Sequence, residues 1–216
     1  MINNLGNEVH RHLLSLGIET PFKHIFRNGK SIPQIVRHLK EILSLLGLDT
    51  KDDSLAQTPQ RIAKMYTEEI FYGLDYNNFP VCAQFDNHMQ YDEMISTSSQ
   101  IKSLCEHHFL PFIGTAYCAY IPETKIIGLS KICRVADFFA RRPQVQERLT
   151  AQIHAALQLI LSTESVAVVI TATHDCVKLR GIQDPESVTV TSKLGGKFMS
   201  NPALRQEFLA LTRTSQ

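Results

Sequence analysis

The sequence lacks a long apolar run, an internal repeat and any excess of basic residues. No apolar stretch approaches the roughly 20 residues that a membrane-spanning helix needs, so we expect no membrane contact. The formal net charge of +1 argues against a nucleic-acid binder, although it leaves room for a small basic pocket. The N-terminus shows no signal-peptide pattern of a basic start and an apolar core. These absences predict a cytoplasmic protein that binds neither membranes nor nucleic acid.

The cysteines are odd in number, which does not suit a disulfide framework. They are Cys82, Cys105, Cys118, Cys133 and Cys176. In a reduced compartment, thiols serve as metal ligands or as small core residues. Cys105 and Cys176 each lie two or three residues from a histidine, and we expect the other three to be core residues.

The first part of the chain has a helical pattern. Apolar residues three and four positions apart predict a helix over residues 31–47. A second helix is expected to begin at Thr58-Pro59 and to end near Gly73, because proline suits the first helical position. Residues 1–30 are polar and weakly periodic, and we expect a tail or a loosely docked arm there.

The later part of the chain mixes strand and helix patterns. Aromatic and β-branched residues predict strands over 112–121, 125–129, 166–173 and 187–192. Helical spacing predicts helices over 131–140 and 145–160, and a last helix after Asn201-Pro202. Helices first, then antiparallel strand pairs with a long helix pair inserted, predict an α+β fold.

Two short segments, Cys-Glu-His-His at 105–108 and His-Asp-Cys at 174–176, contain the residue types that bind zinc. If Cys105, His108 and Cys176 are ligands, a fourth position stays open for water, as in catalytic zinc sites. The spacing is not one of the common zinc-finger spacings, so buried core cysteines remain the alternative. The sequence alone does not show that the two segments meet.

Two histidines would lie beside such a metal without binding it. If the strand from residue 166 continues to Cys176, His174 and Cys176 project from one face and Asp175 from the other. His107 adjoins the proposed ligands in the other segment. Both histidines are therefore candidates for moving protons.

A group of cations suggests a binding site for an anion. Lys131 and Arg134 follow Ser130 at an expected helix start, and Arg61 and Arg180 are further candidates for the same anion site. The alternative is that these are solvated surface charges.

The segment at residues 144–148 contains a second candidate for ligand recognition. An inward-facing Glu147 would accept two N–H donors from a guanine ring, whereas an ordinary helix carboxylate faces solvent.

Four segments together resemble the signatures of the GTP cyclohydrolase I family. They are Cys-Glu-His-His-Phe-Leu-Pro-Phe-Ile-Gly at 105–114, Gly-Leu-Ser-Lys-Ile-Cys-Arg at 128–134, Arg-Pro-Gln-Val-Gln-Glu-Arg-Leu at 142–149 and His-Asp-Cys-Val-Lys-Leu-Arg-Gly at 174–181. The likeness runs from about residue 35 to the C-terminus and includes the helix that starts at Thr58.

The resemblance implies a tunnelling fold, in which a four-stranded antiparallel sheet with a helix pair on one face follows an N-terminal helical region. It divides the chain into a variable arm (1–30), a helical region (31–95) and a catalytic domain (96–216). Subunits of this family form a homodecamer of two stacked five-membered rings, and neighbouring subunits share each active site.

The resemblance also implies a zinc-dependent conversion of GTP to 7,8-dihydroneopterin triphosphate and formate, the first step of pterin and tetrahydrofolate biosynthesis. The zinc ligands would be Cys105, His108 and Cys176. The roles in proton transfer and rearrangement fall on His107, His174 and Ser130. Guanine recognition falls on Gln146 and Glu147, and triphosphate binding on Arg61, Lys131, Arg134 and Arg180. Two alternatives stay open: a GTP hydrolase that stops at a formamide or ring-opened product, and a non-catalytic GTP-binding paralogue.

Overall fold

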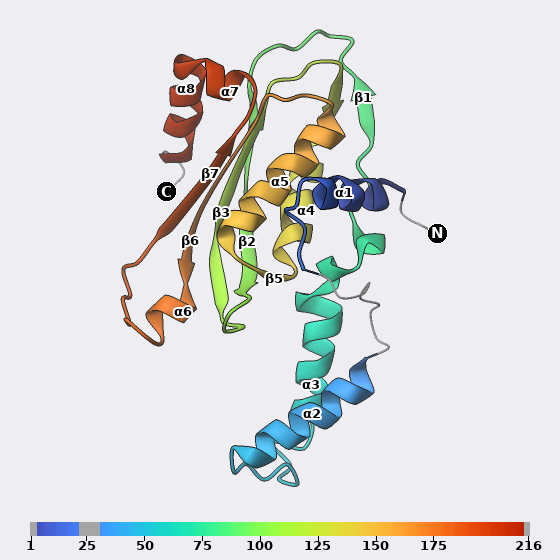
Figure 1. Cartoon of the computed structure of the whole chain (residues 1–216), viewed down its shortest axis with the longest axis vertical. Coiled ribbons are helices and arrows are strands. Elements are labelled where there is room, and N and C mark those ends of the chain that lie inside the picture. Colours follow the sequence, from blue (N-terminus) through green and yellow to red (C-terminus); the bar gives the residue numbers. More distant parts are fainter. Residues whose placement is uncertain (1–3, 22–30, 214–216) are drawn as a thin grey trace.

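The computed structural model describes residues 4–21 and 31–213 (Figure 1). Its α-helices are α1 (Asn4–Ser15), α2 (Ile32–Leu45), α3 (Thr58–Lys64), α4 (Leu129–Ala140), α5 (Gln146–Leu161), α6 (Asp175–Lys178), α7 (Lys197–Ser200) and α8 (Pro202–Arg213). Its strands are β1 (Gln84–Asp86), β2 (Ile95–Cys105), β3 (Pro111–Tyr120), β4 (Lys125–Ile127), β5 (Pro143–Gln144), β6 (Val166–His174) and β7 (Thr189–Leu194). The predicted α+β class is confirmed.

The main sheet has the strand order β5-β2-β3-β6-β7. The four strands from β2 to β7 are antiparallel neighbours, and the two-residue β5 pairs in parallel with the end of β2. Strand β2 was not predicted, because serine and threonine replace apolar residues over much of its length. Strands β1 and β4 form a separate two-stranded sheet.

Helices cover the main sheet on both faces. Helices α4 and α5 lie across one face (Figure 1), and their apolar residues join Ala116, Val168 and Ile170 in the larger core. On the other face, Tyr117 and Val169 pack with residues of α7 and α8. Strand β6 is therefore buried on both faces, which explains its continuous apolar sequence.

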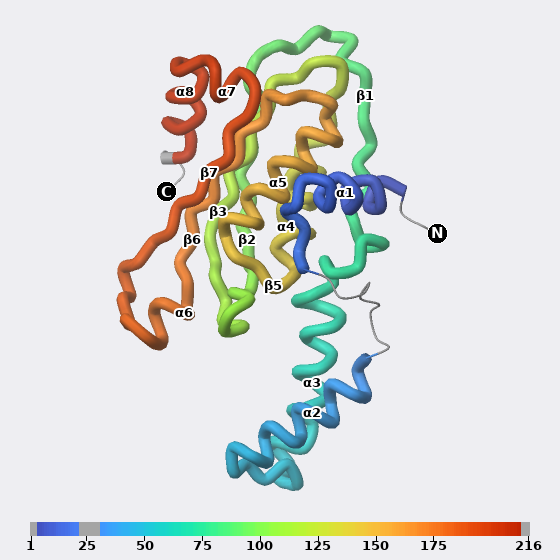
Figure 2. Tube along the Cα trace, viewed as in Figure 1, coloured from blue at the N-terminus to red at the C-terminus, as the bar shows by residue number. Residues whose placement is uncertain are grey.

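Helix α2 confirms the helix predicted over residues 31–47. The second predicted helix is confirmed as α3, which continues directly into a π-helical segment, η1 (Met65–Ile70). Helices α2 and α3 pack on each other and project away from the sheet (Figures 1 and 2). No residue of α2 is buried within the described chain, although its apolar face includes Leu45 and the flanking Leu46.

The predicted loose arm is wrong for residues 4–21. Residues 4–15 form α1, which packs against α5 and against the 3-10 helix η3 (Tyr76–Asn78). Val9 and Leu13 are completely buried. Val9 and Leu13, four positions apart, join the larger core, and Leu5 packs against it. The rest of the predicted arm lies outside the described residues.

A buried ion pair fastens this N-terminal segment to the core. Nη1 of Arg142 lies 3.2 Å from Oε1 of Glu19, and both side chains are almost completely buried. The guanidinium of Arg142 also lies over the rings of Tyr76, Phe138 and Phe139. Arg142 directly precedes β5, so the N-terminal segment is tied to the strand that pairs with the end of β2.

We expect Glu19→Gln to destabilise the protein by about 3–5 kcal/mol, because it leaves the guanidinium of Arg142 buried without its counter-charge. Urea unfolding followed by circular dichroism measures the loss. Asp86→Asn is the matched control, since Asp86 pairs with Lys125 at the surface and should change the midpoint very little. Equal midpoints for the two variants would contradict a stabilising role for the buried pair.

A membrane-spanning segment is not found among the helices of residues 4–21 and 31–213, none of which combines the required length with sufficient hydropathy.

Candidate metal centre

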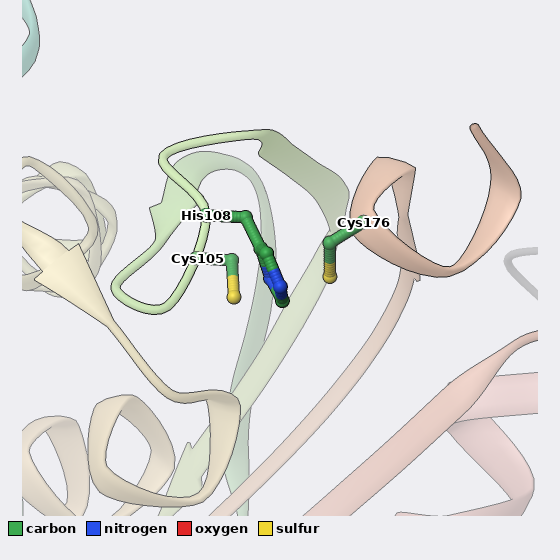
Figure 3. A group of neighbouring side chains, drawn as sticks. All are labelled: Cys105, His108 and Cys176. Carbon is green, nitrogen blue, oxygen red and sulfur yellow. The ribbon is translucent and has the colours of Figure 1, made fainter. Parts of the chain in front are cut away.

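Three side chains from two distant segments meet at one end of the main sheet. The possible ligand atoms of Cys105, His108 and Cys176 all lie within 4.8 Å of one another. Figure 3 shows the imidazole of His108 between the two sulfur atoms, with all three side chains directed toward a common point. The structure thus brings together the three residues that the sequence singled out as metal ligands.

Strand order explains why the two segments meet. Strands β2 and β6 both run antiparallel to β3, so both end beside the start of β3. Cys105 is the last residue of β2, and His174, the last residue of β6, is opposite Phe112 of β3. A tight turn after Cys105 returns the chain, with the amide of Phe109 donating to the Cys105 carbonyl at 2.8 Å.

The strand predicted over residues 166–173 is confirmed as β6, but the condition that it continues to Cys176 is not met. Strand β6 ends at His174, and Asp175 begins the single-turn helix α6. The alternation that placed His174 and Cys176 on one face does not apply, because helical backbone rotates successive side chains by about 100°. Helix α6 directs the sulfur of Cys176 toward His108 (Figure 3).

The chemistry of the three donors suits a borderline-soft metal ion. Two thiols and one imidazole are the donor set that zinc prefers, and three protein ligands leave a position open. Burial raises the pKa of the Cys176 thiol, and the adjacent Cys105 sulfur raises it further. Nη1 of Arg180 donates to Nε2 of His108 at 2.7 Å. Since a guanidinium only donates, Nε2 of His108 accepts in this contact and carries no hydrogen.

The loop that contains His107 and His108 is anchored by an ion pair that the sequence did not reveal. Arg148 of α5 donates to the carboxylate of Glu106, and its Nε donates to Oε1 of Gln144 at 3.1 Å. The amide of Glu106 also donates to the Gln144 carbonyl at 3.0 Å. No spacing rule connects Glu106 with Arg148, because their contact depends on how β5 pairs with β2.

The two predicted proton carriers lie at the same centre. Nδ1 of His107 is 3.6 Å from the sulfur of Cys105, and the His107 side chain is exposed. The ring of His174 stacks on Phe112, with centroids 4.6 Å apart and planes within 10°. Burial lowers the pKa of His174, although Glu147 and Asp175 oppose this effect.

The two predicted guanine-binding residues differ in exposure. Glu147 lies in the first turn of α5 and is exposed. Gln146 is buried, with 2% of its surface exposed, and its amide is bonded to His174 and to strands β6 and β7. Only Glu147 therefore presents its side chain to a ligand in this chain.

The predicted cations do not all gather at the centre. Arg180 is exposed and contacts His108. Ser130, Lys131 and Arg134 lie in the first half of α4, whereas the metal-binding segment adjoins β5, which follows the C-terminal end of α4. A helix of 12 residues is about 18 Å long, so Ser130, Lys131 and Arg134 lie far from the metal centre of the same chain. Arg61 is exposed on α3, in the projecting helical region.

The fold and the donor set define an α+β protein with a candidate metal centre of two thiols and one imidazole. The profile of GTP cyclohydrolase I matches residues 35–213 of the chain. GTP cyclohydrolase 1 of Shewanella sp. (strain W3-18-1) is 53% identical over 204 residues, which are 94% of this chain and 95% of that protein. The proteins of the same name from Tolumonas auensis and Vibrio cholerae are each 55% identical, over 90% and 89% of this chain and 91% and 90% of their own length. The chain belongs to the GTP cyclohydrolase I family, which confirms the resemblance seen in the four sequence segments.

Proposed function

We propose that this protein converts GTP and water to 7,8-dihydroneopterin triphosphate and formate, the first step of pterin and tetrahydrofolate biosynthesis. The observation that supports this most is the convergence of Cys105, His108 and Cys176 within 4.8 Å in a chain of this family. The relatives named GTP cyclohydrolase 1 are matched over nearly their whole length.

The metal proposed for this centre is zinc, held by Cys105, His108 and Cys176. When bound, zinc supplies a Lewis acid that makes water an effective nucleophile near neutral pH. The chain provides the proton carriers: His174 protonates the imidazole ring of GTP, and His107 assists the proton transfers as that ring opens. The ring of His174 is already stacked on Phe112, so orienting it for proton transfer costs little conformational entropy.

Substrate binding divides between the guanine and the triphosphate. Glu147 accepts the N–H donors at the guanine edge, and Arg180 supports the triphosphate near the metal centre. The remaining cations of the pocket are Arg61, Lys131 and Arg134. Ser130 lies near the ribose and takes part in the later rearrangement.

The distance between the metal centre and the cations of α4 within one chain supports an active site shared between subunits. A neighbouring chain in a homodecamer would place its Lys131 and Arg134 against the centre that this chain leaves incomplete. The tunnelling fold is the proposed form of the antiparallel sheet and its helix pair, with residues 31–95 as the helical region and 96–216 as the catalytic domain. Five free cysteines, two of them proposed ligands, favour the reducing cytoplasm.

The proposed recognition of guanine by Glu147 can be tested by substitution. We expect Glu147→Gln to weaken GTP binding about 10- to 100-fold, because it removes a charged acceptor for two N–H groups. Binding is measured by calorimetry in the His174→Ala background, so that GTP is not consumed. Inorganic tripolyphosphate should bind equally with and without the substitution. Glu207→Gln is the control, because the Glu207 side chain is exposed on α8. Equal losses for GTP and tripolyphosphate would refute guanine reading.

The proposed reaction is tested by incubating zinc-quantified protein with GTP and measuring formate, with pteridine fluorescence after oxidation. Formate and neopterin fluorescence, both lost on chelation, are the expected result. Formate without fluorescence would indicate a hydrolase that stops early. Binding of zinc and GTP without either product would indicate a non-catalytic paralogue.

A further inference from the structure

The buried side chain of Gln146 makes four polar contacts within the chain, and its backbone carbonyl makes a fifth. Its Nε2 lies 3.0 Å from the Ile170 carbonyl, 3.1 Å from the Thr189 carbonyl and 3.1 Å from Oγ1 of Thr191. Its Oε1 lies 2.8 Å from Nε2 of His174. Its own carbonyl accepts from Oγ1 of Thr150 at 2.8 Å. Both polar atoms of this side chain are therefore used inside the chain.

The two strand carbonyls determine which way the amide points. Carbonyl oxygens only accept hydrogen bonds, so the atom that faces Ile170 and Thr189 must be the NH2 group. The reversed amide would place an oxygen about 3 Å from two other oxygens, which is repulsive. Two hydroxyls support this orientation. Oγ1 of Thr150 donates to the backbone carbonyl of Gln146, so it accepts from Oγ1 of Thr191, which lies 2.6 Å away. Oγ1 of Thr191 is then free to accept from the NH2 group of Gln146.

The fixed amide in turn determines the proton position on His174. Oε1 of Gln146 carries no hydrogen, so Nε2 of His174 must donate across the 2.8 Å contact. A neutral His174 therefore has its hydrogen on Nε2 and its lone pair on Nδ1. Phe112 stacks on the face of the same ring and limits its rotation. Among the described residues, none forms a hydrogen bond with Nδ1 of His174.

We propose that Gln146 is a positioning residue that holds His174 in the Nε2–H form and leaves Nδ1 as the ring nitrogen with a lone pair for the substrate. This inference rests on the proposed role of His174 in GTP hydrolysis. It replaces the expectation that the side chain of Gln146 reads guanine. The first turn of α5 thus has two functions, in which Gln146 acts through His174 while Glu147 contacts the ligand.

The kinetic test is Gln146→Met, which keeps the length of the side chain and removes the acceptor for His174. We expect turnover to fall about 100-fold while the dissociation constant for GTP changes less than about threefold. Zinc content should match that of the wild type. Gln152→Met is the matched control: Gln152 lies on the same helix, is completely buried, and donates to the Ile18 carbonyl away from His174. Its turnover should stay within about threefold of the wild type. GTP affinity falling about tenfold or more, with turnover preserved, would assign Gln146 to guanine recognition instead.

A spectroscopic test does not depend on activity. Zinc-loaded protein labelled at the histidine nitrogens is sedimented and studied by magic-angle-spinning NMR at about pH 8, where histidine is ordinarily neutral. His174 is assigned by its loss in His174→Asn. We expect a protonated Nε2 and a bare Nδ1 in the wild type, and a mixture of tautomers in Gln146→Met. A wild-type His174 protonated at Nδ1 would overturn the inference. If the wild type releases no formate from GTP, the proposed function fails, and the tautomer result still decides the role of Gln146.

Discussion

Cys176→Ser is expected to remove zinc from the protein and to abolish formate release from GTP. A serine hydroxyl stays protonated near neutral pH and is a poor zinc ligand, so only Cys105 and His108 would remain. Cys176 lies on the single turn of α6 and is one of the three side chains whose ligand atoms lie within 4.8 Å of one another. Zinc is measured by atomic emission after gel filtration, and formate by an enzyme-coupled assay.

The matched control for this variant is Cys82→Ser. The Cys82 thiol lies at hydrogen-bonding distance from the Pro80 carbonyl, 3.6 Å away, and a serine hydroxyl can make the same contact. We expect Cys82→Ser to keep its zinc and its turnover. A zinc-free Cys176→Ser protein that still releases formate at the wild-type rate would refute the metal assignment. Loss of zinc in both variants would indicate a folding effect instead.

His174→Ala is expected to give the second large effect, with zinc and GTP still bound but turnover reduced about 100- to 10,000-fold. The imidazole is not among the three grouped ligands, so its loss leaves the donor set complete. Its removal leaves the amide of Gln146 in place, held by β6 and β7, so the pocket should keep its shape.

Three measurements on this variant separate chemistry from binding. Zinc content and GTP affinity should match the wild type, and rapid-quench analysis should show that no ring-opened product accumulates. His88→Ala is the control, because His88 is exposed and far along the chain from both site segments. Unchanged turnover of His174→Ala would remove this histidine from the mechanism.

The C-terminal end of β6 differs from the geometry that strand alternation suggests. Period-two alternation would place His174 and Cys176 on one face if the strand reached Cys176, but the strand ends at His174 and α6 follows. Both residues still reach the centre, by different local geometries. Residue chemistry grouped these side chains, but it does not specify where a strand changes into a helical turn.

Gln146 shows a second limit of sequence reasoning. In the sequence, a glutamine that is buried in the core cannot be distinguished from one that binds a ligand. Only the packing of α5 against β6 and β7 shows that the amide faces strand carbonyls and His174. The same applies to α1, whose two buried apolar residues become meaningful only against the core they fill.

The sequence by itself determined the α+β class, most of the helices, the family, and the types of residue available for binding a metal and moving protons. These depend on local patterns: apolar spacing, proline at helix starts, and thiols beside histidines. Tertiary structure decided that Cys105 and Cys176 meet, because β2 and β6 both end beside the start of β3. It also decided that the cations of α4 lie away from the centre within one chain. Such placements follow from strand order and hydrogen-bond register, which join residues far apart in sequence and which no local pattern specifies.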